Sequence, residues 1–357
     1  MDRPRKAQAP DQIRPSIGSP LAENAINPGG ESRRGLPGGT GLPSLRGLRA
    51  SFSHHHHGRE LRDPVIDESI LQYRWVKMDR VRIHTVQAGS DDAPLVILLH
   101  GFPEFWCGWK NQIAPLVEAG FRVWVPDQRG YGDSTKPRGV SAYAIDELVG
   151  DVLGVMDAAR CERAHIVGHD WGGAVAWQLA ATHPQRVERL VIMNCPHPRV
   201  MARNITRNPA QMLRSAYIFF FQIPMLPELV LRAKRYALLQ RALRGTSRRG
   251  TFSKGKLALY RQAWSQPGAL TGMINWYRAI RLGGASAAGR SIKPPTLLLW
   301  GARDQFLGRE LAEQSLARCE NGRLEWVEDA THWLHHEEPE RVSNSLLAFL
   351  REDTSSK

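Results

Sequence analysis

The chain has 357 residues, a formal net charge of +13 at pH 7 and a hydrophobic content of 42%. This length suits one large domain with an insertion, or two ordinary domains, and no uninterrupted apolar run approaches the ~20 residues of a membrane-spanning helix. The basic composition comes without a helix-turn-helix, zinc-finger or RNA-binding signature, so we expect no nucleic-acid partner.

The four cysteines indicate a reducing compartment. Cys107, Cys161, Cys195 and Cys319 are widely scattered and form no C-x-x-C motif. In a chain of this length, such spacing is typical of free thiols, whereas a disulfide framework is denser. Because the sequence also shows no secretory signal pattern, we expect a cytoplasmic protein.

The first 65 residues differ from the rest of the chain. Residues 1–65 are rich in Gly, Pro, Arg and Ser, and no helical or strand period persists there. This composition predicts a disordered N-terminal extension. Four consecutive histidines at positions 54–57 could chelate a metal, but a solvated tract is the favoured interpretation, and we expect neither a metal nor an organic cofactor.

Regular patterns begin at about residue 68. Residues 73–76 and 81–86 alternate between apolar and polar side chains, as in an antiparallel hairpin at a sheet edge. Continuous apolar runs, typical of strands buried on both faces, follow at residues 95–99, 123–125, 165–167, 190–193 and 296–300. Helical patterns lie between them at residues 108–118, 145–159 and 172–183. This alternation predicts an α/β fold with a mostly parallel central sheet flanked by helices.

The alternation stops between residues 198 and 292, where the patterns are helical and no strong strand occurs. It resumes at residue 295 and ends with a strand at 324–327 and a helix at 339–350. We therefore predict a core formed by residues 66–197 and 293–357, with residues 198–292 inserted as a helical cap, or lid.

The hexapeptide GHDWGG, residues 168–173, follows a predicted strand and precedes a predicted helix. Its frame is that of a nucleophile elbow, with Asp170 in the place of the nucleophile. A plain turn with Asp as the helix cap is the competing interpretation. The HGFPE segment after the 95–99 strand favours the elbow, because this loop and the residue after the nucleophile supply oxyanion-hole N–H groups. These donors would be Phe102 and Trp171.

A base and its orienting acid are expected later in the chain. His332 follows the last core strand, and Asp304 follows the strand before it, in the order of an α/β-hydrolase triad. Asp329 is a rival acid, but it lies very near His332 in sequence. His335 and His336 close to His332 could suggest a metal site, yet no matching carboxylate frame accompanies them.

A carboxylate nucleophile suits a particular chemistry. By attacking a saturated carbon, Asp170 would form an alkyl ester, which a His332-activated water could then hydrolyse. Epoxides and alkyl halides both fit, but an opened epoxide needs an acid to protonate its alkoxide, whereas a halide needs only N–H donors. The predicted cap offers Tyr217 and Tyr277 as acids; packing is the alternative role of each tyrosine.

Seven segments together resemble the α/β-hydrolase-fold epoxide hydrolases of the soluble type. They are HGFPE (100–104), DQRGYGDS (127–134), GHDWGG (168–173), Y-x-x-x-F-Q (217–222), NWYR (275–278), LLLWGARD (297–304) and THW (331–333). The resemblance implies that Tyr217 and Tyr277 hold and protonate the oxygen of a small lipophilic epoxide, which water then converts to a vicinal diol. The alternative is a haloalkane or haloacid dehalogenase with the same Asp170, in which the Trp171 indole would bind halide.

Four further residues are predicted to line the substrate pocket: Trp106, Phe219, Phe221 and Gln222. A place in the ordinary core is an open alternative for the aromatic residues. Residues 232–256 contain no Asp or Glu but many Arg and Lys. A solvated cap face is the favoured interpretation, and peripheral contact with an anionic membrane is the alternative. A non-catalytic basic membrane-surface protein is a less favoured alternative to the enzyme, and monomer and homodimer both stay open.

Overall fold

The computed structural model describes residues 67–283 and 290–352. The predicted disordered extension, residues 1–65, lies outside the described residues. Eight strands form one sheet: β1 Gln72–Lys77, β2 Arg82–Ala88, β3 Leu95–Leu99, β4 Arg122–Pro126, β5 Ala164–His169, β6 Val187–Met193, β7 Thr296–Gly301 and β8 Gly322–Val327. Their order across the sheet is β1-β2-β4-β3-β5-β6-β7-β8. The first two strands pair antiparallel at the edge and β2 runs antiparallel to β4, whereas all other pairs are parallel, as the sequence predicted.

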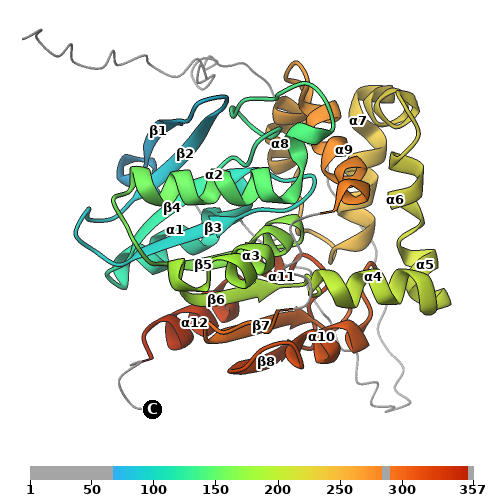
Figure 1. The fold of residues 1–357 in the computed structure, drawn as a ribbon. Helices are drawn as coiled ribbons and strands as arrows, with labels where there is room; N and C mark the ends of the chain where they lie inside the picture. Colours follow the sequence, from blue (N-terminus) through green and yellow to red (C-terminus); the bar gives the residue numbers. More distant parts are fainter. Residues whose placement is uncertain (1–66, 284–289, 353–357) are drawn as a thin grey trace, which may run out of the picture. The chain divides into compact units, whose positions relative to one another are not determined.

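Helices cover both faces of this sheet (Figure 1). The helices that belong to the sheet layers are α1 Lys110–Glu118, α2 Ile145–Ala158, α3 Trp171–Thr182, α10 Arg309–Leu316, α11 Leu334–Glu337 and α12 Pro339–Leu350. β3 shows why its sequence is continuously apolar: Ile97 packs into the core on the side of α2 and α3, and Leu98 packs into the core on the side of α1 and α12. Successive strand side chains point to opposite faces, so a strand covered on both faces needs apolar residues at every position.

Six helices and one short 3₁₀ turn fill the segment between β6 and β7 in the described part of the chain. They are α4 Pro198–Arg207, α5 Pro209–Arg214, α6 Ala216–Phe221, α7 Leu226–Thr246, α8 Lys254–Ser265, α9 Ala269–Ala279 and η5 Ile280–Leu282. The helix α7 is interrupted, because Lys234, Arg235 and Tyr236 have positive φ angles. From here on we call residues 198–292 the cap and residues 66–197 and 293–357 the core, and these boundaries keep the status of a prediction.

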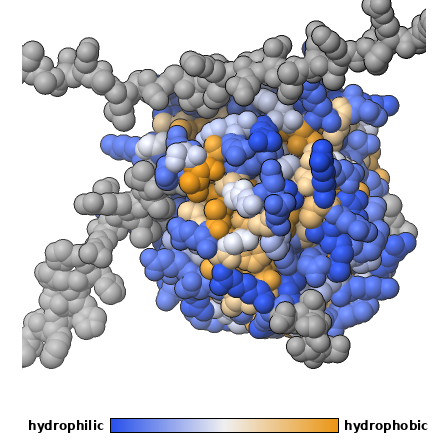
Figure 2. Space-filling model, turned by 90° about the vertical axis from the view of Figure 1, so that its left-hand side faces the viewer, coloured by the Kyte–Doolittle hydropathy of each residue, from blue (hydrophilic) through white to orange (hydrophobic). Residues whose placement is uncertain are grey.

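Two observations concern the surface of the described residues. The described helices include none whose length and apolar character would let it cross a lipid bilayer. Figure 2 shows the face at the left of Figure 1, on which hydrophobic residues form a few small patches between hydrophilic ones. Isolated patches of this size are ordinary for a globular domain.

Candidate active site

Asp170 stands on a strained turn between β5 and α3. Its backbone has φ 50° and ψ −121°, a conformation that non-glycine residues rarely adopt and that is often found at functional sites. Gly172 permits the tight turn, since a Cβ atom there would lie 2.1 Å from the carbonyl oxygen of Leu99. The predicted elbow therefore has the expected geometry: a carboxylate at the carboxyl end of a central strand, at the start of a helix.

The two oxygens of the Asp170 carboxylate have different surroundings. The Phe102 N–H donates a 2.8 Å hydrogen bond to Oδ1, whereas Oδ2 lies 3.7 Å from His332 Nε2. Burial raises the pKa of Asp170, but His332, His169 and the Phe102 N–H outweigh it and lower the pKa overall. The carboxylate is therefore ionised at neutral pH, as a nucleophile must be.

The second predicted oxyanion donor, Trp171, places its side chain in the wall of the cavity. Within the described residues, the Trp171 N–H makes no hydrogen bond to Asp170, and Oδ1 is held by Phe102. The Trp171 side chain lines the cavity and packs edge-on against Tyr277, with ring centroids 5.0 Å apart. A role for the Trp171 N–H in holding an oxyanion stays a prediction.

His332 and Asp304 meet beside the elbow although they are distant in sequence. His332 Nδ1 donates a 2.7 Å hydrogen bond to Asp304 Oδ2, and both side chains are almost fully buried. Asp304 is itself fixed by the Phe306 N–H at 2.7 Å and by the Asn194 side-chain amide at 2.5 Å. The rival acid, Asp329, is exposed and forms an ion pair with Arg303 instead. No sequence pattern indicated the role of Asn194, which directly follows β6 and lies far from Asp304 in the chain.

Two carboxylates control the protonation of His332. Burial lowers the pKa of its imidazole, but the charge of Asp304, together with the charge and hydrogen bonding of Asp170, raises the pKa to about 10. At neutral pH the resting site therefore holds an imidazolium between two carboxylates. Loss of either negative charge would bring this pKa down.

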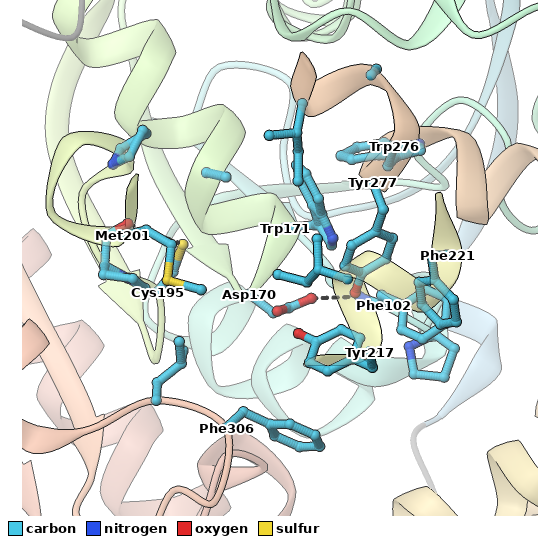
Figure 3. A pocket seen from close by; sticks show the side chains of 18 of the residues that line it. Phe102, Asp170, Trp171, Cys195, Met201, Tyr217, Phe221, Trp276, Tyr277 and Phe306 are labelled. Atoms are coloured by element: carbon cyan, nitrogen blue, oxygen red, sulfur yellow. Dashed lines mark hydrogen bonds between the residues drawn. The ribbon is translucent and has the colours of Figure 1, made fainter. Parts of the chain in front are cut away.

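The cap places both predicted tyrosines over the nucleophile. Figure 3 shows the Tyr217 and Tyr277 hydroxyls pointing toward Asp170 from α6 and α9. Their rings are 5.7 Å apart and nearly perpendicular. Burial raises the pKa of both tyrosines, and the charge of Asp170 adds to this. Both phenols therefore keep their protons at neutral pH and can donate hydrogen bonds into the cavity.

A cavity of about 580 Å³ lies between the core and the cap and contains Asp170, Tyr217, Tyr277 and His332. Its wall is mostly apolar. Besides these four residues, its lining from the core includes Phe102, Trp171, Cys195, Phe306 and Trp333, and from the cap Met201, Ile205, Phe220, Phe221, Leu231, Leu239, Leu243 and Trp276. A cavity of this size and composition suits a lipophilic small molecule.

Of the four residues predicted to line the pocket, Phe221 does, and the prediction was wrong for the other three. Trp106 lies in a short 3₁₀ turn and packs into the core on the far face of the sheet, because its backbone N–H is tied to Asp127. Phe219 is 56% exposed. Gln222 turns from the cavity and donates to the Tyr277 carbonyl oxygen at 2.9 Å, so it joins α6 to α9.

Glu104 is a buried residue beside the active site whose structural role the sequence did not indicate. It is fully buried beside the oxyanion loop and accepts hydrogen bonds from Tyr260 of α8 at 2.7 Å and from His336 of α11 at 2.6 Å. His335 lies 3.2 Å from its other oxygen, and His169, next to the nucleophile, lies 3.3 Å from the same oxygen. One carboxylate thus connects the three catalytic loops and the cap.

The Glu104 cluster also has the composition of a metal site. The candidate ligand atoms of Glu104, His169 and His335 lie within 4.8 Å of one another. However, Glu104 already receives hydrogen bonds from Tyr260 and His336, and His169 Nε2 donates to the His332 carbonyl oxygen at 2.8 Å. Because these bonds satisfy the carboxylate, we interpret the cluster as a hydrogen-bonded network that fixes the loop of His332.

Comparisons with known proteins agree with this geometry. Residues 94–339 match the family described as alpha/beta hydrolase fold. The chain is 46% identical over 281 residues to AB hydrolase superfamily protein YfhM of Bacillus subtilis (strain 168), a match that covers 79% of this chain and 98% of that protein. It is 37% identical over 289 residues to epoxide hydrolase 4 of Mus musculus, covering 79% and 80% respectively. The crystal structure of epoxide hydrolase A from Mycobacterium thermoresistibile superposes with a TM-score of 0.70 at 31% identity, covering 79% and 98%.

Proposed function

The chain belongs to the α/β-hydrolase fold family and, within it, to the epoxide hydrolases, and from this premise we propose that it converts a lipophilic epoxide to a vicinal diol through an ester on Asp170. The observation that supports this mechanism best is the asymmetry of the Asp170 carboxylate. Phe102 holds Oδ1, while Oδ2 is on the side of His332. Substrate enters the apolar cavity beneath the cap, where the two tyrosines bind the epoxide oxygen.

The first half of the reaction is alkylation of the protein. Asp170 Oδ2 attacks an epoxide carbon and forms a C–O bond, while the bond from that carbon to the ring oxygen breaks. The ring oxygen takes a proton from Tyr217 or Tyr277, because a free alkoxide is too basic to leave unprotonated. The tyrosine recovers its proton from the His332 imidazolium, and the site then holds a neutral ester and a neutral imidazole.

The second half is hydrolysis of the ester. The ester carries no charge, so the pKa of His332 falls below its resting value of about 10 and the neutral imidazole can act as a base. A water molecule gives a proton to His332 Nε2 and attacks the ester carbonyl carbon, while the Phe102 N–H stabilises the negative charge on Oδ1. Collapse breaks the bond to the alkoxide, which takes the proton of the newly added hydroxyl group. The diol leaves, Asp170 is ionised again and His332 keeps the proton of the water, so the overall reaction consumes one water.

The test is to stop the cycle between the two halves. His332→Gln keeps a side chain of similar reach but removes the base, so incubation with styrene oxide should raise the intact mass of the protein by one epoxide, and peptide mapping should place the adduct on Asp170. Asp170→Ala supplies the control that forms no adduct. If the His332→Gln variant is folded and stays unmodified, the ester mechanism is refuted. If 1-bromobutane labels Asp170 and the epoxide does not, the dehalogenase alternative replaces our proposal.

A further inference from the structure

The cap exposes an unusual run of apolar side chains. Thirteen large hydrophobic residues are exposed in the described part of the chain, and seven of them lie between residues 212 and 229. We call these seven the apolar ridge: Met212, Leu213, Phe219, Ile223, Met225, Leu226 and Leu229. Three of them are extreme, with Met225 79%, Leu213 78% and Leu229 70% exposed. The ridge runs along α5, α6 and the start of α7, which Figure 1 shows at the side of the cap away from the sheet.

The ridge has no function in the interior of the protein. The same helices turn other residues inward, such as Tyr217, Phe221 and Leu231, and these line the cavity. None of the ridge residues lines the cavity. Seven exposed large apolar side chains within residues 212–229 are unusual on a globular domain unless they contact a partner, so the exposure calls for an external occupant.

Charge indicates what that occupant is. The cap, residues 198–292, contains seventeen Lys and Arg but a single acidic residue, Glu228. That acid is already engaged in an ion pair of 2.6 Å with Arg278. Exposed cations accompany the ridge in sequence: Arg207 precedes it, Arg214 lies within it, and Arg232, Lys234 and Arg235 follow it. In the part of the chain that the structure describes, no carboxylate forms an ion pair with any of these five.

We propose that the apolar ridge docks on an anionic lipid bilayer, with Met225 and Leu229 entering the acyl-chain boundary and the flanking arginines and Lys234 contacting lipid phosphates. Apolar side chains bordered by cations are the pattern of interfacial membrane binding, in which burial and electrostatic attraction add. A second copy of the chain is a poor occupant, because it would bring an equally cationic cap against this one. Nucleic acid would meet the cations but offers no apolar surface for the ridge.

The cavity opens at the surface of the cap, the region that also carries the ridge. Five of the residues that line it are also solvent-exposed, namely Ala202 of α4, Leu238 and Ala242 of α7, and Ile280 and Gly283 after α9. A lipophilic molecule dissolved in the bilayer could therefore pass into the cavity without crossing bulk water. This consequence rests on the proposed function, whereas the docking itself does not.

The docking is tested with vesicles and the full chain. We would measure flotation with vesicles of equal parts phosphatidylcholine and phosphatidylglycerol, and with phosphatidylcholine alone. We expect binding to the anionic vesicles only, weakening as salt is raised. The variant Met225→Glu/Leu229→Glu should bind roughly tenfold or more weakly, because it places charge in the acyl boundary. Its fold should be intact, since both side chains are mostly in solvent.

Matched variants make the result specific to the ridge. Arg232→Glu/Arg235→Glu should weaken binding to anionic vesicles, whereas Trp75→Glu, at an exposed position of β1 in the core, should leave it unchanged. Equal binding by wild type and Met225→Glu/Leu229→Glu would overturn the proposal, as would no flotation of the wild type. A ridge that instead holds two chains together, seen as a dimer that the same double variant dissociates, would also overturn it. Because flotation needs no turnover, its outcome is independent of the proposed reaction.

Discussion

The core and the cap differ sharply in charge and in what they bring to the active site. The core has twenty-one Lys and Arg against twenty-eight Asp and Glu, whereas the cap has seventeen against one. Yet the charged groups at the reacting centre, Asp170, His332 and Asp304, all belong to the core, and the cap contributes the neutral hydroxyls of Tyr217 and Tyr277. The cap keeps its cations outside the cavity, with Arg278 held in an ion pair to Glu228.

The contrast in charge reflects a division of roles between the two regions. Charged groups need a rigid setting in which every hydrogen bond is satisfied, and the parallel strand ends and the Glu104 network supply one. The cap only has to close over the substrate and offer protons, and an apolar inner face with two phenols suffices for that. We therefore expect substitutions in the core to affect the chemical step itself, and substitutions in the cap to have smaller or more selective effects.

Removal of the nucleophile should have the largest effect. Asp170→Ala should reduce diol formation by about 10⁴-fold or more, because the remaining groups cannot form the ester. Initial rates of diol release, with circular dichroism as a check of folding, measure this. Appreciable turnover by a folded Asp170→Ala protein would mean that water attacks the epoxide directly and that the core does not supply a nucleophile.

Removal of one acid from the cap should cost less and should be selective. Tyr277→Phe should lower epoxide turnover by about 10²-fold, since Tyr217 can still protonate the alkoxide, and Tyr217→Phe/Tyr277→Phe should lower it further. Pre-steady-state adduct formation in the His332→Gln background would locate the loss in alkylation. If the double variant alkylates at the wild-type rate, the cap serves only as a cover.

Loss of the Glu104 carboxylate should weaken the connection between the two regions. Glu104→Gln should destabilise the protein by about 2–3 kcal/mol, measured by urea unfolding, because it leaves buried donors imperfectly paired. Burial raises the pKa of Glu104, but His336 and His335 hold it well below its usual 4.5. Because the pKa of Glu104 is lower in the folded than in the unfolded protein, its ionised form stabilises the fold at pH values above about 4.5. This contribution should be lost progressively as the pH falls from about 4.5 through the lower pKa of the folded state. Unfolding curves of the variant should accordingly depend less on pH in the acid range than those of the wild type.

The smallest effect should come from the outward face of α6. Phe219→Ala should change neither the free energy of unfolding by more than ~0.5 kcal/mol nor kcat/KM, since the ring is 56% exposed. Its neighbour Phe221 is buried against the cavity, and Phe221→Ala should cost about 3 kcal/mol and raise KM. Thermal melts and steady-state kinetics on both variants test whether only the inward face of α6 contributes to stability and substrate binding. Equal losses in the two would contradict it.

The strands and the three triad residues could be predicted because each strand is one contiguous segment and each triad residue closely follows a strand. A run such as residues 95–99 is apolar at every position, and the GHDWGG and THW segments carry their residues within a few positions of a strand end. The orientation of α6 could also have been predicted from the spacing of its residues. Tyr217 and Phe221 are four residues apart and share a helical face, whereas Phe219 lies two residues from each and so points away.

Other features depend on contacts between segments that are distant in the chain, and no local sequence pattern indicates them. The partners of Glu104 come from positions 169, 260, 335 and 336, and nothing in the HGFPE segment indicates which of them meet. The break in α7 at residues 233–236 contains no proline or glycine, so no local signal in the sequence marks it. Trp106 packs on the far side of the sheet, where its backbone N–H donates to Asp127, and no local pattern indicates this contact between distant segments.

The hydrogen bond from Phe102 to Asp170 Oδ1 makes the two oxygens of one carboxylate chemically distinct. Under the proposed mechanism Oδ2 leaves in the diol, and the oxygen of the attacking water takes its place beside His332. As long as Phe102 prevents the carboxylate from turning over, this new oxygen becomes the next nucleophile. Each diol would then contain an oxygen atom that became part of Asp170 in the preceding turnover. A change in the oxygen isotope of the solvent water would therefore appear in the diol one turnover late.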